Sequence, residues 1–286
     1  MGLAQNGKAF EQSPSDTSLK TNTIIWGKFH IPPVFILRGT HKGRGTVDQF
    51  ISYLEKHLPT YSHESYEANI SRILNDMTNG RPVCSVMLKN TKRTESLYFS
   101  MPAILNAHHR LFFVRENIAR IENILGYKLG ASISLEDLLS HSDTLKAGLV
   151  AQRAFHPLLD KVLDQHKEKI FYRYGAGAVE GIFMMMKKKR IDYTIEYPSI
   201  QKYVNEVQQS SHDLVGLPIK ELPLFVSGYV ACTKSEWGKK TIHEINKLLS
   251  EHRTKPEFQK IMEYWSTPED IALMQSAYPA FYNKKK

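Results

Sequence analysis

The sequence has few residues of the kinds that build metal or redox sites. It contains two cysteines, Cys84 and Cys232, which lie far apart. Structural zinc sites are built from closely spaced Cys or His pairs, so this spacing predicts no metal site. A run of 18 or more apolar residues is also lacking, and we expect no transmembrane helix in these 286 residues.

Clusters of like charge are also scarce. The formal net charge is +9, yet the basic residues are dispersed, apart from short runs at residues 187–190 and 284–286. Proteins that bind nucleic acid gather Lys and Arg on one face or along one helix. The dispersal therefore argues against nucleic acid as a partner, and a lysine-rich tail is usually solvated.

The first twenty residues lack the apolar core of a signal peptide. They are polar, and we expect residues 1–20 to form a disordered lead. Two locations stay open on composition alone. The protein is either cytoplasmic or an exported protein from which the leader has been removed.

Strands and helices are predicted in alternation over the rest of the chain. Helical spacing of apolar residues recurs at 47–57 and 68–77, and short apolar runs typical of strands surround both. This alternation is typical of βαβ units and a mostly parallel sheet. The other expected elements are strands at 23–27, 61–66, 82–88, 145–151, 170–174, 191–196 and 225–233, helices at 156–166, 179–188 and 237–282, and a proline-punctuated connector at 216–223.

Residues 80–102 contain the most informative local pattern. A turn leads into an apolar strand, which ends in a polar, basic loop that carries Arg93. In open α/β sheets, ligands bind outside the carboxyl ends of the strands. The planar guanidinium of arginine can grip a carboxylate with two parallel hydrogen bonds. Arg93 is therefore a candidate anion-binding residue, and the alternative is an ordinary solvated surface charge.

Six motifs follow one another along the chain. They are a strand into Pro-Pro-x-Phe (26–35), Gly-x-Gly-x-x-Asp with a helix (43–58), a helix ending in Asn-Gly with a strand (68–88), Thr-Lys-Arg and Phe-Ser-x-Pro (91–102), a helix with Lys-Arg-Ile-Asp and a strand (184–195), and a return strand with a helix (229–249). In this order they resemble the family-3 extracellular solute-binding proteins, the type II periplasmic binding fold typified by amino-acid receptors of ABC importers. The chain is identified as a divergent member.

The resemblance implies an α/β fold with two lobes joined by two crossover segments. Each lobe would hold a mixed, mostly parallel sheet flanked by helices. Lobe 1 would comprise residues 21–113 plus 225–286, and lobe 2 residues 114–224. The resemblance also implies a periplasmic or extracellular location, with a leader sequence absent from this chain.

Ligand-binding positions on lobe 1 follow from the same resemblance. Arg93 matches the arginine that grips the ligand's α-carboxylate in amino-acid receptors of this family. Ser85 and Met87 occupy the strand end that offers backbone and hydroxyl groups to the ligand, unless they are simply buried strand residues. Phe29 and His30 lie where the family places an aromatic lid, although rings here would also serve as core packing.

On lobe 2 the resemblance points to Arg153 and Tyr197. Arg153 stands in a loop where amino-acid receptors carry small hydroxyl residues that receive carboxylate oxygens at a helix N-terminus. A dianionic or larger ligand would explain this arginine, and so would surface exposure. Tyr197 replaces the acid that binds the ligand's amine, and alternation along the strand turns Glu196 to the opposite face. An ordinary α-amino acid is therefore not the expected ligand.

The resemblance places Cys84 and Cys232 on strands of lobe 1. In an oxidising compartment they would pair as a disulfide, and the alternative is two buried thiols.

Together these features predict an extracytoplasmic protein that captures a small carboxylate-bearing solute between two lobes by hinge closure, for ABC-type uptake. The alternative is a sensing or interaction module that has the same fold with a repurposed cleft. We expect no enzymatic activity and no cofactor, because no motif positions a catalytic group. The expected partners are a small anionic solute and a membrane transporter or sensor protein, and we expect a monomer.

Overall fold

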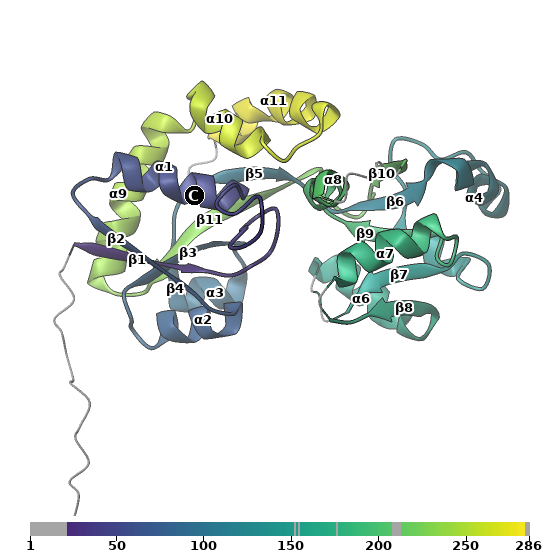
Figure 1. Cartoon of the computed structure of the whole chain (residues 1–286), viewed down its shortest axis with the longest axis horizontal. Helices are drawn as coiled ribbons and strands as arrows, with labels where there is room; N and C mark the ends of the chain where they lie inside the picture. Colours follow the sequence, from purple (N-terminus) through teal and green to yellow (C-terminus); the bar gives the residue numbers. More distant parts are fainter. Residues whose placement is uncertain (1–21, 152, 154, 176, 208–212, 284–286) are drawn as a thin grey trace, which may run out of the picture.

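The structure is a computed structural model that describes residues 22–151, 153, 155–175, 177–207 and 213–283. The lead expected at residues 1–20 lies outside them. The described elements gather into two lobes, each built around its own β-sheet (Figure 1). The expected two-lobe α/β architecture is therefore confirmed. Within the described residues, none of the helices combines the length and the apolar character needed to cross a membrane.

The sheet of lobe 1 has the strand order β2-β1-β3-β11-β4, and β5 pairs with the other end of β11. β2 and β3 run parallel to β1, so the carboxyl ends of these three strands meet at one edge of the sheet. The elements of lobe 1 are β1 (Thr23–Lys28), α1 (Thr46–His57), β2 (Ser62–Glu67), α2 (Ile70–Thr78), β3 (Val83–Met87), α3 (Thr91–Ser96), β4 (Leu97–Phe99), β5 (Ile104–Ala107), β11 (Phe225–Thr233), α9 (Glu236–His252), α10 (Pro256–Glu263) and α11 (Pro268–Asn283).

The sheet of lobe 2 has the order β10-β6-β9-β7-β8. β8 and β9 run parallel to β7, and their carboxyl ends also share one edge. The elements of lobe 2 are β6 (Arg110–Val114), α4 (Ile118–Leu125), α5 (Leu135–Ser140), β7 (Ala147–Val150), α6 (Pro157–Gln165), β8 (Ile170–Arg173), α7 (Ala178–Lys187), β9 (Tyr193–Glu196), α8 (Pro198–Val207) and β10 (Leu214–Pro218).

Two short segments connect the lobes. Residues 108–109 link β5 to β6, and residues 219–224 link β10 to β11. The segments lie side by side, because the backbone N–H of His108 donates to the carbonyl of Leu224 over 2.9 Å. β6 hydrogen-bonds to β9 and β10, so this strand lies in the sheet of lobe 2. The resemblance placed residues up to 113 in lobe 1, whereas the strand at 110–114 pairs within the sheet of lobe 2.

Both sheets contain a larger antiparallel share than the alternation of strands and helices predicts. β11 runs antiparallel to β3, β4 and β5, and β6 runs antiparallel to both of its neighbours. The reason is that the chain crosses between lobes twice, and each crossing delivers a strand in the reverse direction.

Each lobe has its own hydrophobic core on both faces of its sheet. In lobe 1, α1 and the C-terminal helices cover one face, and α2 covers the other. In lobe 2, Leu111 and Phe113 pack towards α4–α6, while Phe112 between them packs towards α7 and α8. This division follows the period-two alternation of a strand buried on both faces. Because each core is complete within one lobe, the gap between the lobes needs no apolar packing to hold the fold together.

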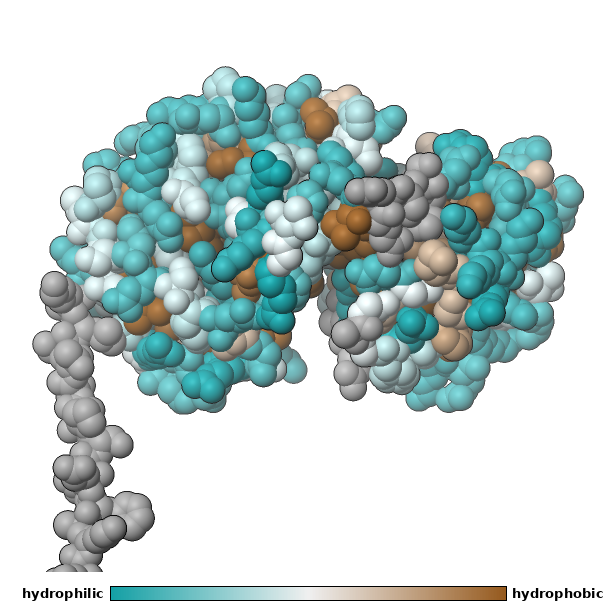
Figure 2. Space-filling model, in the orientation of Figure 1, coloured by the Kyte–Doolittle hydropathy of each residue, from teal (hydrophilic) through white to brown (hydrophobic). Residues whose placement is uncertain are grey.

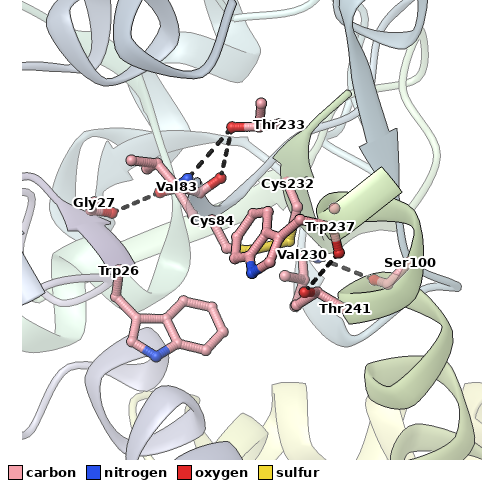
Figure 3. The surroundings of a disulfide bond; sticks show 12 residues. Trp26, Gly27, Val83, Cys84, Ser100, Val230, Cys232, Thr233, Trp237 and Thr241 are labelled. Carbon is pink, nitrogen blue, oxygen red and sulfur yellow. Dashed lines mark hydrogen bonds between the residues drawn. A yellow bond between two sulfur atoms is a disulfide. The ribbon is translucent and has the colours of Figure 1, made fainter. Parts of the chain in front are cut away.

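Cys84 and Cys232 form a disulfide inside lobe 1, as the sequence predicted. They are directly opposite each other on β3 and β11, with their Cα atoms 4.1 Å apart. Figure 3 shows the disulfide between these strands, with the Thr233 side chain hydrogen-bonded to the backbone of Val83 beside it. Both cysteines are fully buried. The bond joins two strands that are 148 residues apart in sequence.

Candidate functional site

The lobes are separated by an open gap below the point where they join (Figure 2). In lobe 1, the segments that follow β1 and β3 lie on the side that faces this gap, and α3 borders it. In lobe 2, the carboxyl end of β7 and the start of α6 lie on the facing side (Figure 1). The carboxyl-terminal edges of two sheets thus face each other, which is where α/β proteins bind ligands.

Phe29 and His30 follow β1 and line a cavity of about 730 Å³ in lobe 1. Arg38 and Glu67 line the same cavity and form an ion pair with each other. The Phe29 ring packs against Phe35, with ring centroids 5.1 Å apart. The backbone N–H of residue 37 donates to Nδ1 of His30 over 3.2 Å, which fixes this nitrogen as the acceptor. Partial burial lowers the pKa of His30, and the Arg38 charge lowers it further.

Arg93 lies in the short helix α3, where the sequence predicted a loop. Asn90 caps this helix, because its side-chain oxygen accepts the backbone N–H of Arg93 over 2.9 Å. The guanidinium donates to the carbonyl of Leu88 over 2.8 Å, and among the described residues no carboxylate pairs with it. Burial lowers the pKa of Arg93, since desolvation disfavours its charge. A half-buried cation without a counter-ion is a favourable place for an anion.

Ser85 and Met87 do not reach the gap in this structure. Ser85 is fully buried, and its hydroxyl donates to the carbonyl of Gly27 over 2.7 Å. Met87 is buried among apolar residues of β1, α2 and β11. Both side chains therefore serve the packing of lobe 1 in this state.

Lys89, Phe99 and Tyr229 form a cluster at the carboxyl end of β3 that the sequence analysis did not single out. The Lys89 ammonium lies 6.0 Å from the centroid of Phe99 and 5.7 Å from that of Tyr229. The aromatic rings themselves pack edge to face. Contacts of this kind between an ammonium group and aromatic rings are attractive, so they hold the Lys89 charge beside these two rings.

Arg153 and Glu196 form a buried ion pair in lobe 2. The side chain of Glu196 is only 3% exposed and that of Arg153 19%. The other carboxylate oxygen of Glu196 accepts the backbone N–H of Tyr197 over 2.9 Å. Burial raises the pKa of Glu196, while the Arg153 guanidinium counteracts this rise. Arg153 is thus neither a solvated surface charge nor a cation without a counter-ion. Its neighbours Gln152 and Ala154 lie outside the described residues.

Tyr197 belongs to an aromatic cluster at the hinge, together with three histidines. Its ring lies 3.7 Å from that of His109, and His108 and His156 pack edge to face beside it. Burial lowers the pKa of His108 to about 4 and that of His109 well below its ordinary value. Burial raises the pKa of Tyr197 to about 12, so its hydroxyl stays protonated. The sequence analysis missed these histidines, although the adjacent pair His108–His109 is visible directly before an apolar strand.

The structure therefore divides the sequence-predicted site residues into four groups, one of which is the pair Ser85 and Met87 buried in lobe 1. Phe29 and His30 share a cavity, and Arg153 and Tyr197 meet around Glu196, while Arg93 stands apart on α3. One group of described side chains could hold a metal ion, namely His57, His252 and Glu257. This group lies in lobe 1, on helices that do not border the gap between the lobes.

No protein-family model matches this sequence, and no curated protein matches it at a significant level. Solved structures do match over most of the chain. The probable amino-acid ABC transporter extracellular-binding protein of Bacillus subtilis is 16% identical, with a TM-score of 0.62 over 87% of this chain and 100% of its own. An ancestral amino-acid-binding protein, described as a precursor of cyclohexadienyl dehydratase, is 15% identical, with a TM-score of 0.58 over 86% of this chain and 96% of its own.

A sensing protein is equally similar in structure. It is a histidine kinase sensor domain with similarity to periplasmic binding proteins, and it is 14% identical, with a TM-score of 0.58 over 86% of this chain and 96% of its own. The binding protein and the sensor domain thus both match the fold of this chain over most of its length. The chain is a divergent example of the two-lobe periplasmic binding protein fold of type II.

Proposed function

We propose that this chain is an extracytoplasmic binding protein that captures a small carboxylate-bearing solute between its lobes by hinge closure. The proposal includes delivery of the solute to a membrane importer by a monomeric, non-catalytic protein. Structurally similar proteins bind amino acids for ABC transporters, which supports the class of function. The buried disulfide supports an oxidising compartment outside the cytoplasm.

The proposal depends mainly on the surroundings of the Arg93 guanidinium. Arg93 is half-buried on α3, the helix that borders the gap, and its guanidinium donates to the carbonyl of Leu88. Within the described part of the chain it has no carboxylate partner, so further donors remain for a ligand. A carboxylate between the lobes would supply the missing negative charge and give Arg93 charge-assisted hydrogen bonds.

Glu196 and Arg153 argue against an ordinary α-amino acid as the solute. The acid beside the expected amine position is already occupied by the guanidinium of Arg153. Tyr197 offers a hydroxyl and a ring in place of a carboxylate, and its ring is engaged with His109. We therefore propose a carboxylate without a strongly bound ammonium group, such as a simple carboxylic acid or a short peptide.

The direct test is a thermal-shift and calorimetric screen of monocarboxylates, dicarboxylates, amino acids and short peptides. For the solute that binds, Arg93→Ala should weaken the affinity roughly 10- to 150-fold, the equivalent of about 1.5–3 kcal/mol for hydrogen bonds to a charged group. Arg72→Ala is the matched control, because it removes an exposed arginine from the neighbouring helix α2. Equal affinities of wild type and Arg93→Ala would remove Arg93 from the site.

A sensing role is the second candidate function. The likeness to a histidine kinase sensor domain and the internally neutralised Arg153–Glu196 pair favour it. A sensor would bind a membrane protein without any importer, while its cleft need not bind a solute. Co-purification with a membrane kinase and failure of every solute to shift the melting temperature would favour sensing over transport.

A further inference from the structure

We propose that His57, His252 and Glu257 form a site for a zinc-like divalent transition-metal ion that links the first helix of lobe 1 to its C-terminal helices. One ligand atom from each residue lies within 4.8 Å of the other two. Two imidazoles and a carboxylate suit zinc, which binds such ligands at about 2.0–2.2 Å in a tetrahedral arrangement. The site lies outside the gap, and the inference is independent of the proposed function.

The residues come from three different helices. His57 is the last residue of α1, His252 is the last residue of α9, and Glu257 lies in the first turn of α10. Figure 1 shows these helices together over one face of lobe 1. His57 ends α1 just before β2 begins, so it lies towards the sheet edge opposite the gap. Metal binding here would join segments about 195 residues apart without obstructing the solute site.

The hydrogen bonding of His57 already has the pattern of a metal ligand. Its Nδ1 lies 2.8 Å from the carbonyl oxygen of Tyr53, and only a protonated Nδ1 can donate to that oxygen. The lone pair is therefore on Nε2, the nitrogen left for a metal. Metal-binding histidines almost always donate their other ring N–H to a carbonyl or carboxylate in this way.

Tyr53 aligns the other two ligands. Its hydroxyl is 2.8 Å from Nδ1 of His252 and donates to Oε1 of Glu257, also over 2.8 Å. The Tyr53 side chain is buried, and its ring stacks on His57 at 4.2 Å between centroids. Nε2 of His252 accepts a hydrogen bond from the Lys255 ammonium group over 3.2 Å, so Nδ1 carries the ring proton and donates to the Tyr53 hydroxyl. To bind an ion through Nδ1, which faces Tyr53 and Glu257, the ring must move this proton to Nε2 and Lys255 must turn away.

Small side-chain movements would close the site around an ion. Tetrahedral ligands at about 2.1 Å from zinc lie roughly 3.4 Å from each other, so separations of up to 4.8 Å must shorten. The two histidines are only half-buried and Glu257 is exposed, so their side chains have room to turn. Water would supply the remaining ligand on the exposed side, or the Tyr53 hydroxyl would do so.

The test uses the full chain, with any affinity tag removed, and Zn²⁺ or Co²⁺ alone as the probe. We expect one ion per chain by calorimetry, a tetrahedral Co²⁺ absorption spectrum, and a melting temperature raised by about 5–10 °C at a hundredfold excess over the dissociation constant. His57→Ala and His252→Ala should each weaken binding at least tenfold, since loss of even an outer-shell partner costs about 10–100-fold. His243→Ala, an exposed histidine on the same helix α9, is the matched control and should bind normally.

Absence of saturable binding, or equal binding by the wild type and the His57→Ala and His252→Ala variants, would overturn the proposal. Such a result would leave Tyr53, His252 and Glu257 as a hydrogen-bond network that needs no ion. If either histidine variant melts at a lower temperature than the wild type without metal, the binding experiment uses Glu257→Gln instead. Glu257 is exposed, so this substitution should leave the fold intact. That variant should also lose at least tenfold in Zn²⁺ affinity, and unchanged affinity would equally overturn the site.

Discussion

Replacing Arg153 with alanine should destabilise lobe 2, because the buried carboxylate of Glu196 would lose its counter-ion. Removing one partner of a buried ion pair typically costs about 3–5 kcal/mol. The lower value is expected here, since Arg153 is 19% exposed and Glu196 keeps its hydrogen bond from the backbone of Tyr197. Urea unfolding followed by circular dichroism should therefore show a lower midpoint with an unchanged slope. The double variant Arg153→Met/Glu196→Leu should recover most of the loss, because it leaves no buried charge.

The pH dependence provides an internal check on this reasoning. Burial already raises the pKa of Glu196, and loss of the Arg153 charge removes the main influence that lowers it. A carboxyl group whose pKa is raised in the folded state destabilises that state when it is ionised, and the cost disappears as the pH falls and the group binds a proton. The difference in unfolding free energy between wild type and Arg153→Ala should therefore be smaller at pH 5 than at pH 8.

One outcome would refute the structural role of the pair. If Arg153→Ala unfolds at the wild-type urea concentration but no longer binds the solute, then Arg153 acts as a ligand-binding residue. A bound solute would itself stabilise the folded state by mass action. The unfolding experiment is therefore done without solute, so that it reports the contribution of the ion pair alone.

Two further predictions follow from buried groups. Replacing both cysteines with alanine should lower the free energy of unfolding by up to about 5 kcal/mol, the chain-entropy value for a loop closed across 148 residues. Thiol titration of the unfolded wild type without reductant should find no free thiol, and two free thiols would contradict the disulfide. Burial lowers the pKa of His108 from 6.5 to about 4, and His156 and Arg153 add positive charge at the same cluster. The free energy of unfolding should therefore fall by about 3 kcal/mol as the pH drops from 6.5 to about 4. His108→Asn should flatten that pH dependence when unfolding is measured at several pH values, and an unchanged profile would show that other groups cause it.

Local sequence patterns correctly predicted those helices and strands whose buried face follows from the regular spacing of their own apolar residues. The apolar stripes of α1 and α9 are buried as expected, and the strand expected at residues 225–233 has these limits in the structure. Cys84 and Cys232 were paired correctly only after a fold had been inferred, because their spacing alone carries no geometry. These elements are ones in which side-chain spacing and burial agree.

Elements that depend on remote partners were missed or altered. β10 was expected to be a connector, because Gly216 and Pro218 are poor strand residues, yet it pairs with β6 at the edge of its sheet. Edge strands tolerate proline because one side needs no hydrogen bonds. The same reason applies to the site. The ion pair between Arg153 and Glu196 spans 43 residues, so the sequence displayed both charges without showing that they neutralise each other.

The position of β11 has a consequence for the order in which the chain can fold during synthesis. The sheet of lobe 2 is complete once residue 218 has been made, because its strands come from one continuous segment, and Ile219 and Leu222 then complete the core of this lobe. Lobe 1 lacks an interior strand of its sheet until residues 225–233 are made, and Cys84 has no partner before then. A nascent chain of this length would therefore hold the complete sheet of lobe 2 while the sheet of lobe 1 still lacks an interior strand.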